Sequence, residues 1–300
     1  MIALGVGIVY SRRSDGRTLL NRGGKLLVLG YILNVLREVI PYMILAARTG
    51  DVMYKQAAWE YLWGADILAF AGLTFIFFGL VKQFKIKNEY LFVIWCGMAT
   101  LNLILRDISF ENKVTNTIAG LFWGTNDYSW FPFLTWIFYP ILGYFFGQFL
   151  IKCKDKEVFY RRLLVSMGML SVPLWIYAYI NNVQFGAFGE LYQGAYYHHD
   201  LMGNMILGTF ALFWISICFY IVKIIPQKVY SMFARWSRNV DMMYFVHYII
   251  LGWLILVIEM EAQTPQMVVV IATCVFIVTD LICIGLKGMS QNRAAEQLIN

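Results

Sequence analysis

Two of the three histidines in the chain stand side by side, in the segment Tyr196-Tyr197-His198-His199-Asp200. Histidine has an unperturbed pKa near ~6.5, so a neutral imidazole can take a proton from a hydroxyl or an amine at neutral pH. A neighbouring carboxylate can orient the ring and stabilise the imidazolium. The segment therefore predicts general-base catalysis by His198 or His199, with Asp200 as the orienting group.

The same segment has a structural interpretation. Asp200 suits the N-cap of an apolar helix that begins near Met202. That interpretation uses the aspartate and leaves the histidines without a role. Two adjacent residues are not a specific motif, so the sequence leaves both interpretations open.

A second candidate site is the pair Arg37-Glu38, which lies in an apolar stretch. Ionisable residues inside membrane spans cost ~2.5–3.5 kcal/mol each on insertion scales, so each is a functional candidate. Tyr31, Asn34, Glu38 and Pro41 recur at helical spacing and predict one polar stripe. Adjacent helical positions point ~100° apart, so Arg37 and Glu38 cannot both face one partner squarely. The pair is either a structural ion pair, or part of a tunnel in which Arg37 contacts a donor and Glu38 a substrate.

Other polar and small residues in apolar stretches favour packing roles. Asp66 and Asp280 are each candidates for a hydrogen bond between helices. His247, alone on an apolar helix, is more typical of a buried histidine with a satisfied ring. Gly143 and Gly147 form a G-x-x-x-G pattern, which predicts a closely packed helix face.

The composition places these residues in a membrane. The 300 residues are 60% hydrophobic and 14% charged, whereas soluble domains carry about 25% charged residues. We therefore expect an all-α fold, a polytopic integral membrane helical bundle that forms a single domain over 1–300. The net charge of +6 is spread over short loops, so it indicates membrane topology and no nucleic-acid partner. The five cysteines lack paired spacing, so we expect neither a metal site nor a disulfide framework.

Eight full transmembrane helices are predicted, and a ninth apolar segment at 1–10 is too short to span a bilayer, which takes ~20 residues. The short segment is expected to be the end of a span whose beginning is missing, so the sequence suggests N-terminal shortening. Residues 288–300 are expected to form a cytoplasmic tail. The predicted full spans lie at about 25–47, 61–81, 89–106, 129–151, 161–182, 202–223, 240–260 and 266–287.

Basic residues alternate between the two sets of loops. By the positive-inside rule, the richer set faces the cytoplasm, which places both termini inside and the His198-His199 segment outside, in a plasma membrane of bacterial type. The richer set holds Arg12, Arg13, Arg17, Arg22, Lys25, Lys82, Lys85, Lys87, Lys152, Lys154, Lys156, Arg161, Arg162, Lys223, Lys228, Arg235, Arg238, Lys287 and Arg293. The poorer set holds Arg48, Lys55, Arg106 and Lys113.

The longest loops, at 107–128 and 183–201, both fall on the predicted outer side and are rich in aromatic residues. Trp123, Trp130, Tyr196 and Tyr197 are candidates for stacking against a sugar substrate. The alternative for such residues is an aromatic belt at the membrane interface.

Three segments resemble the polytopic membrane acyltransferases, the broad group that contains the acyltransferase-3 and heparan-α-glucosaminide N-acetyltransferase-like families. The basic loop with Asn21-Arg22-Gly23-Gly24-Lys25-Leu26-Leu27, leading to Arg37-Glu38-Val39-Ile40-Pro41, is similar to their second-to-third-span region. The segment from Phe131 to Gly147 resembles their aromatic-Pro-x-x-x-Trp…G-x-x-x-G span. The segment from Ser237 to His247 resembles their late Tyr-x-x-His span. The family's first span, which carries an Arg and a His in the acyltransferase-3 pattern, has no counterpart here.

The resemblance implies transfer of an acyl group, usually acetyl, from cytoplasmic acetyl-CoA or another acyl-CoA to an extracytoplasmic carbohydrate hydroxyl or amine. The partners would be the lipid bilayer and a glycan or lipid-linked sugar, and no metal would be needed. The candidates for binding the donor phosphates are Arg12, Arg13, Arg17, Arg22, Lys25 and Arg37, although the loop cations also fit topology alone.

Two other functions stay open on the sequence. The first is a transporter or flippase of a polar or lipid-linked substrate, with Arg37, Glu38, Asp66 and Asp280 as its polar pathway. The absence of a visible repeat relating the two halves argues against it. The second is a non-catalytic membrane remnant, which the missing first span would explain.

Overall fold

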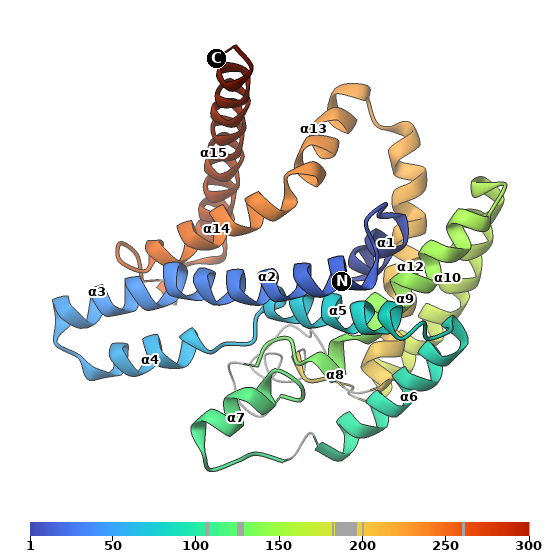
Figure 1. Cartoon of the computed structure of the whole chain (residues 1–300), viewed down its shortest axis with the longest axis horizontal. Coiled ribbons are helices and arrows are strands. Elements are labelled where there is room, and N and C mark those ends of the chain that lie inside the picture. The colour runs from blue at the N-terminus through green and yellow to red at the C-terminus, as the bar shows by residue number, and fades with distance from the viewer. Residues whose placement is uncertain are drawn as a thin grey trace. The chain divides into compact units, whose positions relative to one another are not determined.

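The chain folds entirely into helices and their connections in the part that the computed structural model describes (Figure 1). That part covers residues 1–105, 108–124, 129–181, 183, 197–199, 201–259 and 262–299, with side chains described as far as 288. The predicted all-α class is confirmed.

Among these residues, seven helical stretches are long and apolar enough to cross a membrane. The protein is therefore an integral membrane protein of the polytopic helical type. The stretches are Gly16–Thr49, Val52–Gln83, Asn88–Leu105, Phe133–Lys152, Lys156–Ile180, Leu201–Ile224 and Pro265–Gly288.

The helices divide between two compact units. The first unit comprises Met1–Tyr31 and Trp63–Lys223, and the second comprises Ile32–Leu62 and Ile224–Asn300. The helices of the first unit are α1 (Ile2–Tyr10), most of α2 (Gly16–Asn34), α5 (Ile67–Gln83), α6 (Asn88–Leu105), α7 (Lys113–Gly120), α8 (Phe133–Trp136), α9 (Phe138–Lys152), α10 (Lys156–Ile180) and α12 (Leu201–Ile224). Those of the second are η1 (Val35–Val39), α3 (Ile40–Thr49), α4 (Val52–Leu62), α13 (Gln227–Arg238), α14 (Val240–Leu254) and α15 (Pro265–Ile299).

Glycines let two helix pairs of the first unit approach at backbone distance. A Cβ at Gly5 of α1 would lie 1.9 Å from the Pro140 carbonyl of α9, and a Cβ at Gly143 would lie 2.0 Å from the Ile2 carbonyl. The predicted packing role of the G-x-x-x-G pattern in α9 is thus confirmed, with α1 as its partner. Gly23 of α2 and Gly72 of α5 face each other in the same way, at 2.6 Å from a built Cβ to the opposing carbonyl. Small residues at helix contacts are typical of membrane bundles.

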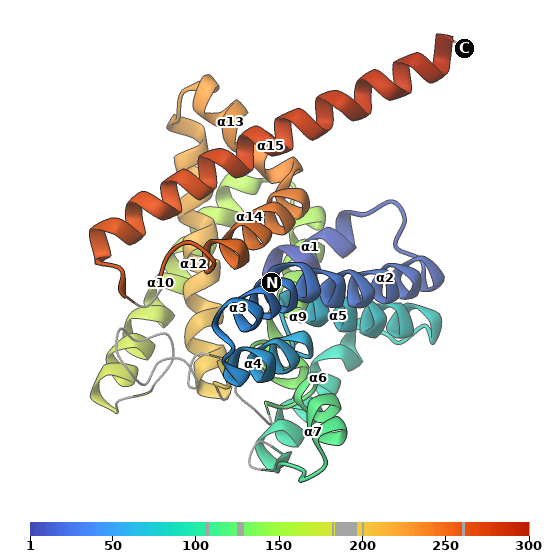
Figure 2. The ribbon, with the colours of Figure 1, turned by 90° about the vertical axis from the view of Figure 1, so that its left-hand side faces the viewer.

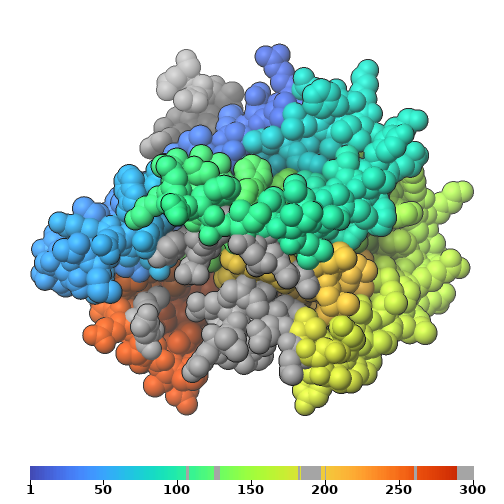
Figure 3. Space-filling view, turned by 90° about the horizontal axis from the view of Figure 1, so that it is seen from below, coloured from blue at the N-terminus to red at the C-terminus, as the bar shows by residue number. Residues whose placement is uncertain are grey.

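The outer surface of α6 is largely apolar. Phe92, Val93 and Ile104 on this helix are exposed, and the helix is visible on the face shown in Figure 3. Exposed apolar side chains suit helices that face lipid, because the bilayer takes the place of a protein partner.

In the second unit, α3 and α4 form a hairpin in which the two helices run side by side (Figures 1 and 2). The turn between them uses Gly50 in the left-handed conformation, at φ 74°, which glycine adopts without steric cost. The Gly50 N–H donates to the Ala46 carbonyl, and the Asp51 carboxylate accepts from Met53 N at 2.8 Å. This sequence therefore ends one helix and caps the next.

Two predicted spans differ from the helices observed. The span predicted at 61–81 is interrupted, since α4 ends at Leu62 and α5 begins at Ile67. Asp66 was predicted to form a hydrogen bond between helices. The structure shows that it caps α5, with its Oδ1 accepting from Ile67 N at 2.6 Å. The span predicted at 240–260 corresponds to α14, which has 15 residues and reaches about 22 Å.

Candidate functional site

A buried polar cluster surrounds His199 in the first unit. His199 lies two residues before the start of α12, Asn204 lies in the first turn of α12, Tyr139 lies on α9, and Thr135 and Trp136 lie on α8. All five side chains are buried. We refer to these five residues as the His199 cluster.

The hydrogen bonds of the cluster indicate that Nε2 of His199 carries a hydrogen. His199 Nε2 lies 2.9 Å from Asn204 Oδ1 and 3.0 Å from Tyr139 Oη. The amide nitrogen of Asn204 donates to the Thr135 carbonyl at 3.2 Å, which turns the amide oxygen toward His199. Because that oxygen can only accept, Nε2 carries a hydrogen, and the neutral ring has its lone pair on Nδ1.

Tight packing holds the ring in this place. The rings of His199 and Trp136 form a T-shaped pair, with 4.9 Å between the ring centroids and planes inclined by 79°. Gly203 lies directly against His199, since a Cβ built there would be 2.7 Å from the histidine Cβ. The Trp136 indole also donates to the Tyr197 carbonyl at 2.8 Å and so anchors the segment that precedes α12.

His198 has a different environment. Its Nε2 lies 2.6 Å from the Ser129 carbonyl, so this nitrogen carries a hydrogen and donates to the backbone. A Cβ at Gly124 would lie 2.6 Å from the same ring nitrogen. The two loops predicted to share a side of the membrane therefore contact each other through His198. Asp200 and Tyr196 lie outside the described residues.

Two of the predicted sugar-stacking residues, Trp123 and Tyr197, pack against one hydrophobic core. Trp123 donates from Nε1 to the Ile108 carbonyl at 2.9 Å, and Trp130 is half-buried. The Tyr197 ring packs edge-on against Phe131, at 5.4 Å between centroids. Tyr197 adjoins the His199 cluster through its carbonyl contact with Trp136.

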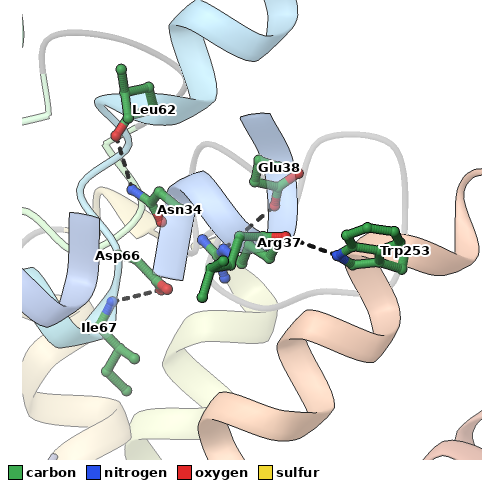
Figure 4. Close-up of polar contacts among 8 residues, drawn as sticks. Asn34, Arg37, Glu38, Leu62, Asp66, Ile67 and Trp253 are labelled. Atoms are coloured by element: carbon green, nitrogen blue, oxygen red, sulfur yellow. Dashed lines mark hydrogen bonds and ion pairs between the residues drawn. The ribbon is translucent and has the colours of Figure 1, made fainter. Parts of the chain in front are cut away.

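A second site is the π-helical turn η1, which belongs to the second unit (Figure 4). Pro41 has no N–H to donate, and the Ile40 N–H bonds to Val35, five residues back. The carbonyls of Leu36 and Arg37 thus lack the partners that an α-helix supplies. The Trp253 indole of α14 donates to the Leu36 carbonyl at 3.0 Å.

Gly252, the residue before Trp253, also contacts the π turn. Gly252 lies against the Arg37 carbonyl so closely that a Cβ would be 1.8 Å from the oxygen. Both carbonyls released by the π turn therefore meet α14, one through a hydrogen bond and the other through direct backbone contact. Irregular turns of this kind are frequent at functional sites.

The π turn also changes which side chain is buried. The sequence predicted that Glu38 shares a helix face with Asn34 and Pro41. In the structure the residue buried together with Asn34 and Pro41 is Arg37, which is 3% exposed. The Arg37 guanidinium lies 4.6 Å from the centre of the Tyr248 ring, and its Nε lies 3.5 Å from Glu38 Oε1. The extra residue in the turn displaces the α-helical stripe, and the two charges pair with each other.

Five predicted donor-binding cations form one set in the first unit. They are exposed, and none forms an ion pair with another residue that the structure describes. The set consists of Arg12, Arg13, Arg17, Arg22 and Lys25.

A carboxylate lies within this basic segment, just before α2. The side chain of Asp15 accepts from Thr18 N at 3.0 Å, and hydrogen bonding by Thr18 lowers the pKa of the Asp15 carboxyl. Arg37 was predicted to act with the basic set, but it is buried and belongs to the second unit.

The other intramembrane residues have local partners. Asp280 of α15 forms an ion pair with Arg235 of α13, which is a contact between helices. His247 Nδ1 lies 2.9 Å from the Met243 carbonyl in its own helix, which fits the predicted packing role.

Sequence reasoning missed Tyr139, Asn204 and Thr135. One signal was present, because Asn204 is the polar residue of an otherwise apolar first turn, five positions after His199. Searches against protein-family models, curated proteins and solved structures give no match to this chain.

Proposed function

We propose that the protein is a membrane acyltransferase that moves an acyl group, in the simplest case acetyl, from acyl-CoA to a carbohydrate hydroxyl or amine across the membrane. The observation that supports this most is the His199 cluster, in which a buried imidazole has a fixed tautomer and its lone pair on Nδ1. An oriented imidazole is the group that general-base catalysis requires.

In the proposed reaction, His199 Nδ1 takes the proton of the acceptor hydroxyl or amine. The acceptor oxygen or nitrogen attacks the thioester carbonyl as this proton leaves, the carbon–sulfur bond breaks, and the departing thiolate receives the proton from the imidazolium. Asn204 Oδ1 and Tyr139 Oη face the N–H on Nε2, so they stabilise the imidazolium while it carries the extra charge.

The exposed basic set beginning at Arg12 is the proposed contact for the donor phosphates. Clustered guanidinium groups bind phosphate oxygens bidentately. The distribution of Lys and Arg among the loops supports placing this set, and both termini, in the cytoplasm.

We expect the two ends of α6 to be accessible from opposite sides of the membrane. In a variant without native cysteines, Glu111→Cys should react with an impermeant maleimide added to intact cells, and Gln83→Cys should react only after permeabilisation. Both positions are exposed, and α6 separates them. The opposite labelling pattern would reverse the orientation and with it the assignment of the donor side.

The enzymatic function is tested by acetyl transfer in proteoliposomes, with radiolabelled acetyl-CoA on the side of the basic loops and an aminosugar on the other. The triple variant Arg12→Glu, Arg13→Glu, Arg17→Glu should raise the KM for acetyl-CoA by about tenfold or more, because each charge-assisted bond contributes ~1.5–3 kcal/mol. The matched control Lys85→Glu, Lys87→Glu should change KM less than about threefold. An equal KM in the triple variant would remove the basic set from the donor site.

The second candidate function is transport, and the Arg37 turn is the observation that favours it. A buried cation in an irregular turn at membrane depth is typical of a polar pathway. Uptake of a polar solute into the same vesicles without acetyl-CoA, combined with no acetyl transfer by the wild-type protein, would replace the acyltransferase proposal with this one.

A further inference from the structure

The helix α13 is confined by very short connections to its apolar neighbours in the chain. Two residues separate it from the end of α12 at Ile224, and one residue separates it from α14, which begins at Val240. An extended residue reaches about 3.3–3.6 Å, so these links allow little departure from the ends of the flanking helices. The 12 residues of α13 form a rod about 18 Å long. Such a rod, joined at both ends to apolar helices, must lie near the membrane surface.

The sequence of α13 divides into two faces. One face is apolar and carries Val229, Met232, Phe233 and Trp236, which follow the spacing i, i+3, i+4 and i+7. The opposite face carries Lys228, Ser231, Arg235 and Arg238, at spacing i, i+3, i+7 and i+10. The helix contains no acidic residue. This pattern of aromatic residues opposite basic ones is typical of helices that lie in the membrane interface.

Protein contacts account for only part of this surface. Trp236 packs edge-on against Phe276 of α15, at 4.8 Å between ring centroids, and Arg235 pairs with Asp280 of the same helix. These contacts hold one side of α13 against α15. Tyr230 and Phe233 are 43% and 50% exposed.

The cations of α13 that form no ion pair indicate what the exposed surface binds. Lys228 and Arg238 are exposed, and neither forms an ion pair within the described part of the chain. A surface with exposed aromatic rings and unneutralised cations complements a leaflet that contains anionic lipid.

We propose that α13 lies in the plane of the membrane interface and binds anionic phospholipids. Tyr230 and Phe233 enter the boundary between headgroups and acyl chains, and Lys228 and Arg238 pair with the phosphate headgroups. By the charge distribution of the loops, this leaflet is the cytoplasmic one. The inference is independent of acyl transfer, because it rests on α13, on its connections to α12 and α14, and on its contacts with α15.

The test places an environment-sensitive NBD label on Phe233→Cys, in the full-length chain without native cysteines, reconstituted in nanodiscs. Raising the phosphatidylglycerol content of phosphatidylcholine nanodiscs should shift the NBD emission to the blue and make it sensitive to doxyl-labelled lipid. Adding Lys228→Gln and Arg238→Gln should raise the phosphatidylglycerol content needed for half of this shift by about fivefold or more, because each interfacial cation contributes ~1 kcal/mol.

The control pair is Lys85→Gln, Lys87→Gln, which removes two exposed cations from another loop of the same charge set. These variants should respond to phosphatidylglycerol as the unmodified protein does. The proposal fails if the label reports a water-like environment in every lipid mixture. It also fails if the label is already shielded in detergent and ignores the lipid, which would indicate a protein partner on this face. Equal loss of the response in both pairs would mean that total charge, and not α13, binds the lipid.

Discussion

His199→Gln should lower the rate of acyl transfer by about 10²–10⁴-fold, the range that a general base contributes. The glutamine amide can place an N–H where Nε2 now points toward Asn204 and Tyr139, so the hydrogen bonds of the cluster are retained. It has no nitrogen that can accept a proton, so only the base is removed. The measurement is kcat for acetyl transfer by the full-length protein, with the melting temperature recorded for each variant.

The adjacent histidine is the matched control. His198 Nε2 donates to the Ser129 carbonyl, which is a structural contact, so His198→Gln should keep kcat within about threefold. Tyr139→Phe and Asn204→Ala should give intermediate losses, because they weaken stabilisation of the imidazolium without removing the base. A His199→Gln variant that melts normally and keeps full activity would contradict the assignment, and His247 would be the next candidate.

Gly252→Ala should destabilise the fold by about 2–3 kcal/mol, a large effect for a single methyl group. The new Cβ would lie 1.8 Å from the Arg37 carbonyl, and this neighbour is backbone and cannot rotate away. Separating α14 from the π turn would also break the bond from Trp253 Nε1 to the Leu36 carbonyl. A buried carbonyl left without a donor costs a further ~1–3 kcal/mol.

Gly285→Ala is the control for this substitution. It changes a helical glycine of the same unit whose Cβ would meet nothing within 4 Å, so it should be neutral or stabilise by up to ~1 kcal/mol. Thermal unfolding in detergent, followed by tryptophan fluorescence, measures both variants. Equal melting temperatures for Gly252→Ala and Gly285→Ala would show that α14 does not contact the π turn as closely as the structure indicates.

Features that depend on local sequence were predicted well. The apolar stretches predicted the helices. The spacing of Gly143 and Gly147 predicted a closely packed helix face, although not that its partner is α1. The environment of His199 depends on Tyr139, which is 60 positions away in the chain. A single sequence gives no signal for such a pairing, so the histidines were identified while the groups that orient one of them were not.

The irregular backbone was the other omission. A span predicted from hydropathy is continuous, because apolar residues are equally frequent on both sides of a break. Asp66 is the residue that marks the interruption between α4 and α5, since its side chain caps the second helix. Pro41 similarly indicates a disturbed helix four residues upstream. The released carbonyl of Leu36 is bound by Trp253, which lies 217 positions away from it, and a single sequence gives no signal for this partner.

The π turn makes the register of α3 adjustable. A π turn contains one residue more than an α turn, and passing that residue along the helix would convert the turn to α geometry. Every side chain between the old and new positions of the extra residue would then rotate by ~100° and advance by ~1.5 Å along the axis. At Val35–Val39, such a step would exchange the buried position between Arg37 and Glu38 and reverse the sign of the charge facing Tyr248. The bond from Trp253 Nε1 to the Leu36 carbonyl therefore holds the turn in the register that places the positive charge of Arg37 against Tyr248.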